Sequence, residues 1–189
     1  SLAQRRPEIA SKLAIYEVDQ PGPQAWNRQR LQDAGFGIPP GLHLVPVDFE
    51  AGGSWWNEIK AAGFDPARSA VVASTGVSLY LTKEANAATL RQVAALAPGS
   101  TFAMTFLLPI EMAEPDERIG FEAAIKGAKA SGTPFVSFFT PGEMLAMASE
   151  AGFRQVRCVS GAELAQRYFA GRSDGLRPGS AEALLMATT

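Results

Sequence analysis

The chain has 189 residues, a formal net charge of −2 at pH 7 and a sequence pI near 5.5, with 47% hydrophobic and 19% charged residues. This composition excludes a basic nucleic-acid binder and a chain that is mainly disordered, and it is rich enough in apolar residues for one folded domain. One cysteine, Cys158, and one histidine, His43, exclude an internal disulfide and a zinc cluster, so we predict no metal site. No apolar run of membrane or signal-peptide length occurs, so we expect no membrane partner and a cytoplasmic location.

The first part of the chain alternates short apolar segments with helix-like stretches. Its apolar segments predict strands at residues 13–18, 42–47, 69–74 and 101–108. Helices are expected at 2–12, 24–34, 55–62 and 83–96. This alternation, at about 30 residues per unit, is typical of an α/β protein with a parallel sheet.

The second part adds an insertion and two helix-start signals. Residues 109–134 are rich in charge with apolar residues at helical spacing, which predicts either a lid or a helix packed on the sheet edge. Capping boxes begin at Thr140 and Ser160 and predict helices after them. A strand is expected at 155–159, a helix at 162–169 and a last apolar segment at 183–187.

Polar residues follow three of the predicted strands, where ligands bind in parallel sheets. Glu17 and Asp19 end the first strand; a carboxylate there can accept hydrogen bonds from ribose hydroxyls, or can be the charge at a helix start. Asp48 and Phe49 end the second; they can meet an adenine, or can form a turn with a core ring. After the third strand, the turn that begins with Thr75 has room for a close ligand, or is a plain strand-to-helix turn.

The sequence lacks the residues that other classes of reaction require. A hydrolase triad needs a histidine, and His43 lies in a predicted strand ahead of the serine candidates. No phosphate-binding P-loop motif is present, and the glycines between Gly35 and Gly41 follow a helix with the wrong spacing for a dinucleotide loop.

The strand ends together resemble a known family. The motifs that carry the resemblance are E-V-D-Q-P at 17–21, V-P-V-D-F at 45–49, A-G-F-D-P-A-R at 62–68, T-G-V-S-L-Y-L at 75–81, T-P-G-E-M at 140–144 and A-G-F at 151–153. They are similar to those of the leucine carboxyl methyltransferase-like family of S-adenosylmethionine-dependent methyltransferases, in its bacterial branch. The resemblance implies a class I methyltransferase fold, which is Rossmann-like: a doubly wound, mostly parallel sheet whose last strand is antiparallel.

The same resemblance implies roles for individual residues. Asp19 would hold the ribose of S-adenosylmethionine, beside Glu17, and Asp48 with Phe49 would meet its adenine. Thr75 stands where the family commonly has Glu near the methionine part of the cofactor, and Tyr80 would contact the substrate. No catalytic residue is predicted, because methyl transfer depends mainly on alignment.

The family's first strand and its glycine-rich loop are not found in the chain. Residues 1–189 are therefore expected to be the C-terminal part of a single methyltransferase domain, truncated at its N-terminus, with the insertion at 109–134. We expect an O-methyltransferase that modifies a carboxylate or hydroxyl of a small molecule or a peptide end. The alternatives are a non-catalytic α/β binding or interaction domain and an NAD-dependent dehydrogenase; the oligomeric state stays open.

Overall fold

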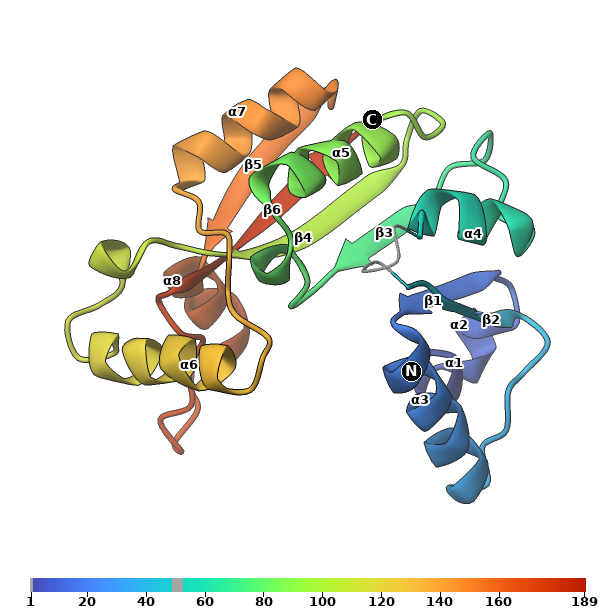
Figure 1. Cartoon of the computed structure of the whole chain (residues 1–189), viewed down its shortest axis with the longest axis horizontal. Coiled ribbons are helices and arrows are strands. Elements are labelled where there is room, and N and C mark those ends of the chain that lie inside the picture. The colour runs from blue at the N-terminus through green and yellow to red at the C-terminus, as the bar shows by residue number, and fades with distance from the viewer. Residues whose placement is uncertain (1, 49–52) are drawn as a thin grey trace. The chain divides into compact units, whose positions relative to one another are not determined.

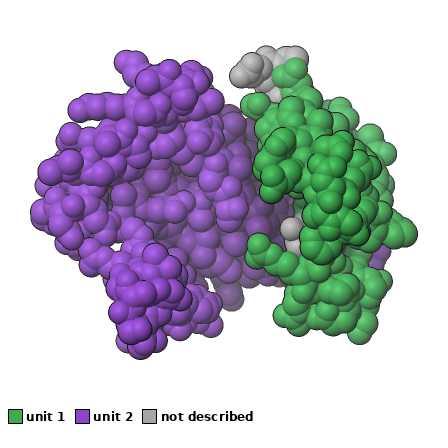
Figure 2. Space-filling model, turned by 90° about the horizontal axis from the view of Figure 1, so that it is seen from below, with its two compact units in different colours: residues 1–66 green, residues 67–189 purple. Residues whose placement is uncertain are grey.

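A computed structural model describes residues 2–48 and 53–189. The chain divides into two compact units, residues 1–66 and residues 67–189, which Figure 2 shows in green and purple. Each unit contains its own sheet. Among the described residues, no helix combines the length and the apolar character needed to cross a membrane.

The first unit is built on two parallel strands. Its elements are α1 (Leu2–Arg5), α2 (Pro7–Ala10), β1 (Ile15–Asp19), α3 (Pro21–Asp33), β2 (Leu42–Pro46) and α4 (Trp55–Ala61). The two predicted strands are confirmed, and their register runs from Ile15 opposite Leu42 to Asp19 opposite Pro46. The single helix expected at 2–12 is wrong: Pro7 begins a second helix, because proline lacks the N–H that would continue the first.

Both faces of this small sheet are covered. Leu42 packs with Ala3, Ala10 and Leu31 in one apolar cluster, to which Ile15 and Leu44 add partly buried side chains. A second cluster on alternate strand positions contains Val45, Val47 and Ile59, with Tyr16, Val18, Trp55 and Trp56 packed against it. Alternation along β1 and β2 therefore divides the side chains between helices α1 to α3 and helix α4.

The second unit holds four strands in the order β3-β4-β6-β5. Its elements are β3 (Val71–Ser74), η1 (Ser78–Tyr80), α5 (Lys83–Ala94), β4 (Thr101–Leu107), η2 (Ile110–Met112), α6 (Arg118–Ala130), α7 (Pro141–Ala151), β5 (Gln155–Ser160), α8 (Gly161–Leu164), the π-helix η3 (Ala165–Phe169) and β6 (Glu182–Thr188). β3 and β4 are parallel, whereas β6 is antiparallel to both β4 and β5. The expected antiparallel last strand is confirmed.

The capping box predicted at Thr140 is confirmed, whereas the one predicted at Ser160 is present only as a side-chain cap. Thr140 and Glu143 form a reciprocal capping box at the start of α7, and the Ser160 hydroxyl accepts from the Glu163 N–H at the start of α8. Each cap satisfies backbone donors that the first turn of a helix leaves unpaired.

The insertion at 109–134 contains the expected amphipathic helix, α6, and is tied to the chain before β6. The carboxylate of Glu117 accepts from both the backbone N–H and the hydroxyl of Ser180, each at 2.7 Å. The two Ser180 hydrogen bonds, with Arg177 beside them, hold the pKa of Glu117 below its ordinary value. The lid function of this insertion stays a prediction.

Candidate active site

The carboxyl ends of β1 and β2 lie at one edge of the first unit's sheet. Asp19, the last residue of β1, is the register partner of Pro46, and its carbonyl accepts from the Val47 N–H at 2.8 Å. Asp48 follows directly after Val47. Asp19, which is predicted to hold the ribose, and Asp48, which is predicted to meet the adenine, thus lie at the same end of the sheet, because adjacent parallel strands end together.

Asp19 is placed at the junction between β1 and α3. Its Oδ1 accepts from the Gln20 N–H at 2.8 Å, and the residue is exposed. α3 begins two residues later at Pro21, so the carboxylate lies beside the N-terminus of a 13-residue helix. An exposed carboxylate held by its own backbone turn is well placed to accept hydrogen bonds from a ligand's hydroxyls.

Glu17 is bonded to helix α3. The Asn27 side-chain amide donates to Glu17 Oε2 at 3.3 Å, and the buried Gln24 amide donates to the Glu17 carbonyl at 2.5 Å. These two bonds from one helix fix the strand that carries Asp19. The cofactor contact predicted for Glu17 stays a prediction.

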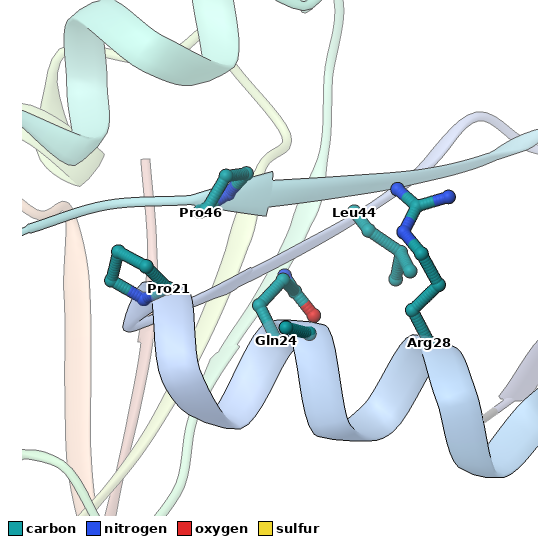
Figure 3. A pocket seen from close by; sticks show the side chains of 6 residues that line it. Pro21, Gln24, Arg28, Leu44 and Pro46 are labelled. Atoms are coloured by element: carbon teal, nitrogen blue, oxygen red, sulfur yellow. The ribbon is translucent and has the colours of Figure 1, made fainter.

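An open pocket lies between α3 and β2 on the same unit. Its lining residues are Pro21, Gln24, Ala25, Arg28, Leu44 and Pro46. Figure 3 shows Arg28 extending from α3 towards β2, beside Leu44. Sequence reasoning missed this pocket. One sequence signal could have indicated it. Residues 21, 24, 25 and 28 share one face of the helix, and polar Gln24 and Arg28 stand there in place of the usual apolar residues.

The backbone of Gly53 lies close to that of Asp48, which follows β2. The Gly53 N–H donates to the Asp48 carbonyl at 2.7 Å, and a Cβ added at Gly53 would lie 2.5 Å from that same oxygen. Only glycine fits this approach, since the opposing atoms belong to backbone. Phe49, the other predicted adenine residue, lies outside the described residues.

We therefore expect Gly53→Ala to lower the free energy of unfolding of the first unit by about 1–3 kcal/mol, because the added methyl group must push the Asp48 backbone aside. All three tryptophans of the chain lie within residues 1–66, so denaturant unfolding followed by tryptophan fluorescence reports on this unit. Gly22→Ala is the matched control: a Cβ there meets nothing within 4 Å. Equal unfolding midpoints for the two variants would contradict the steric argument.

In the second unit, the predicted residues lie on the segment between β3 and α5. Thr75 is exposed directly after β3, and Gly76 has a φ of +68° and donates its N–H to Thr105 Oγ1 at 3.0 Å. Tyr80 is 49% exposed, with its ring edge-on to Phe135 at 5.7 Å between centroids. Thr75 thus directly follows the carboxyl end of β3, and Tyr80 ends η1, six residues after that strand. The contacts predicted for Thr75 and Tyr80 stay predictions.

Buried polar groups hold this segment in place through hydrogen bonds. The Ser78 hydroxyl donates to the Thr105 carbonyl at 2.7 Å. The Asn86 amide nitrogen lies within hydrogen-bond distance of three carbonyls, those of Ser78, Leu81 and Thr82. Ser78 and Asn86 are each only 1% exposed. The segment that carries Thr75 and Tyr80 is therefore held by donors supplied from α5 and by acceptors from β4.

The arrangement of strands and helices matches solved methyltransferases. PigF, solved with SAH, aligns with 100% of this chain and 46% of its own at a TM-score of 0.60 and 15% identity. A candidate O-methyltransferase from Nostoc punctiforme PCC 73102 aligns with 100% of this chain and 47% of its own, at a TM-score of 0.59 and 16% identity. The chain has the α/β fold of class I methyltransferases.

Sequence comparison relates the chain to one family. Residues 1–94 match the leucine carboxyl methyltransferase family. YktD of Bacillus subtilis strain 168, named as a candidate S-adenosyl-L-methionine-dependent methyltransferase, is 30% identical over 173 residues, which are 91% of this chain and 56% of YktD. A similarly named protein of Mycobacterium avium strain 104 is 34% identical over 57% of this chain and 34% of its own length. The chain is similar to the leucine carboxyl methyltransferase family over residues 1–94, and it spans about half the length of YktD.

Proposed function

We propose that this chain is part of an S-adenosylmethionine-dependent methyltransferase and that the β1–β2 edge of its first unit holds the adenosine part of that cofactor. The observation that carries the proposal is the placement of Asp19 and Asp48 at one carboxyl edge. The names of the relatives and the SAH bound to PigF support the choice of cofactor.

The residues present fit the adenosine group. A ribose offers two neighbouring hydroxyl donors, and the exposed carboxylate of Asp19 is an acceptor with two oxygens. Adenine offers an amino group, for which a carboxylate such as Asp48 is the matching acceptor. Phe49 keeps its predicted role of covering the base.

The reaction that we propose is methylation of a carboxylate or hydroxyl on a small molecule or a peptide end. When bound, S-adenosylmethionine would supply a methyl group: its bond to the positively charged sulfur would break as the bond to the substrate oxygen forms, leaving S-adenosylhomocysteine. A hydroxyl substrate would also release its proton to solvent. A carboxylate substrate needs no base, because it is already ionised at neutral pH. The protein's contribution is then to align the two reactants and to exclude water.

The proposal is tested by calorimetric titration of the full-length protein that contains this chain, with S-adenosylmethionine in one series and NAD⁺ in another. We expect saturable heat with S-adenosylmethionine only. Heat with NAD⁺ only would point to a dehydrogenase instead, and heat with neither would point to a non-catalytic binding domain. Either result would overturn the proposal.

A further inference from the structure

The chain between α6 and α7 runs beside η1 and past the carboxyl end of β4 (Figure 1). The Val136 N–H donates to the Leu79 carbonyl of η1 at 2.7 Å. The Phe139 N–H donates to the carbonyl of Leu107, the last residue of β4, at 2.9 Å. Residues 135–139 are therefore bound to η1 at one end and to the carboxyl end of the sheet at the other.

A buried serine anchors each of these two segments. Ser137 is only 1% exposed, and its hydroxyl donates to the Leu81 carbonyl at 2.5 Å. Ser78 of η1 is equally buried, and its hydroxyl donates to the Thr105 carbonyl of β4. Buried hydrogen bonds of this kind are costly to break, because each would leave an unpaired polar group. The backbone on both sides is thus held in place, and so are the side chains that it presents to solvent.

Those presented side chains are apolar. Val77 and Tyr80 are 40% and 49% exposed, and they lie three residues apart across the 3₁₀ turn η1, a spacing that puts side chains on the same side. Val136 is 51% exposed, and the partly buried ring of Phe135 lies edge-on to that of Tyr80, with 5.7 Å between the centroids. We call Val77, Tyr80, Phe135 and Val136 the apolar patch.

The segments that form the apolar patch carry no charge. Residues 75–82 and 131–139 contain no Asp, Glu, Lys, Arg or His, although 19% of the chain is Asp, Glu, Lys or Arg. The first charged residue after η1, Lys83, is already paired with Glu143, at 3.2 Å. The patch also lies at the carboxyl end of the parallel strands β3 and β4, where ligands bind in such sheets. An exposed apolar surface in that position is typical of a site for a small molecule.

We propose that the apolar patch binds an uncharged aromatic ring in the body of the methyl acceptor, and that Phe135 and Val136 are specificity-determining residues for that acceptor. This inference rests on the proposed function and narrows it to ring compounds that carry no charge beyond the reacting oxygen. A ring can pack against the edge-on pair of Tyr80 and Phe135. A second charged group on the substrate would lose its water there without meeting an opposite charge, and would therefore be disfavoured.

The test is the binding of 2-naphthol to the full-length protein, measured by saturation-transfer NMR of the ligand's ring protons. 2-Naphthol is an uncharged ring compound with one hydroxyl, and myo-inositol, a ring with a hydroxyl on every carbon, is the polar comparison. Val136→Asp places a charge in the patch. Leu176→Asp is the matched control, because Leu176 is an apolar residue of the same unit, outside the patch, and is 56% exposed against 51% for Val136.

We expect saturable binding of 2-naphthol to the parent protein and to Leu176→Asp with the same Kd, and no binding of myo-inositol. In Val136→Asp the Kd for 2-naphthol rises at least about tenfold, because the ring would cover a carboxylate that has no partner. 2-Naphthol carries no charge at neutral pH, so repulsion between charges does not contribute to this rise.

Absence of 2-naphthol binding to the parent, equal Kd values for the two variants, or equally tight binding of myo-inositol would overturn the inference. A light-scattering mass of two chains for the parent and of one chain for Val136→Asp would show a second copy on the patch and would also overturn it. If Val136→Asp fails to fold, Tyr80→Ser removes a ring of the patch instead. Its control is then Tyr168→Ser, at an exposed tyrosine elsewhere in the unit.

A titration of the same protein with S-adenosylmethionine alone separates this inference from the proposed function. Binding of S-adenosylmethionine without binding of 2-naphthol would overturn the inference and leave the proposed function standing. Binding of 2-naphthol without binding of S-adenosylmethionine would overturn both, because the inference names the ring compound as a methyl acceptor.

Discussion

Replacing Asp19 with alanine in the full-length protein weakens the binding of S-adenosylmethionine by about 1–3 kcal/mol, or roughly 5- to 150-fold in Kd. The variant removes the acceptor that we assign to the ribose hydroxyls. Asp19→Asn keeps the side-chain size and one acceptor oxygen, so its Kd for S-adenosylmethionine lies between that of the parent protein and that of Asp19→Ala. Calorimetric titration of the three proteins measures the effect.

The control for this prediction removes the same charge elsewhere in the unit. Asp33 is the last residue of α3, at the opposite end of that helix from Asp19. Its carboxylate accepts a hydrogen bond from the Gln29 side chain of the same helix. Asp33→Asn keeps the affinity of the parent protein. The ribose assignment would be wrong if Asp19→Ala also kept the parent's affinity for S-adenosylmethionine, or if Asp33→Asn lost as much affinity as Asp19→Ala.

Replacing Asn86 with aspartate lowers the free energy of unfolding by about 2–4 kcal/mol. The Asn86 amide nitrogen donates towards three carbonyls in a site that is 1% exposed. A carboxylate there faces those carbonyls with oxygens alone, and its protonated form offers a single donor. For a chain of this size the thermal midpoint falls by roughly 4–16 °C.

Gln155→Glu makes the same amide-to-carboxylate change at an exposed position in β5 of the same unit. Its thermal midpoint stays within about 2 °C of the parent, because a solvated carboxylate costs little. Circular dichroism melts of the two variants compare them directly. A midpoint for Asn86→Asp within that range would show that the three carbonyls do not depend on the Asn86 amide.

The strands and most helices could be predicted because their signals are local. Short apolar segments and a capping box at Thr140 are each contained within a few residues. The meeting of Asp19 and Asp48 was also predictable, since two parallel neighbours must end at the same edge. The helix expected at 2–12 does not take account of Pro7, which begins a second helix. The helix expected at 24–34 likewise does not take account of Pro21, where α3 begins three residues earlier.

The remaining features depend on which elements meet in three dimensions. The polar network around Asn86 joins residues of β4, α5 and the segment between β3 and α5. The residues around Asn86 in the sequence do not indicate which groups it bonds. The pocket beside Arg28 likewise needs α3 to lie against β2. The exposure of Val71 in β3 cannot be read from the apolar sequence around it.

We propose above that the carboxyl ends of β1 and β2 bind adenosine. The most direct measurement is a crystal structure of the full-length protein with S-adenosylhomocysteine. It should show both ribose hydroxyls within hydrogen-bond distance of the Asp19 carboxylate and the adenine amino group at Asp48, with Phe49 against the base. A nucleoside bound away from Asp19, with Asp19 contacting only protein or solvent, would contradict the claim.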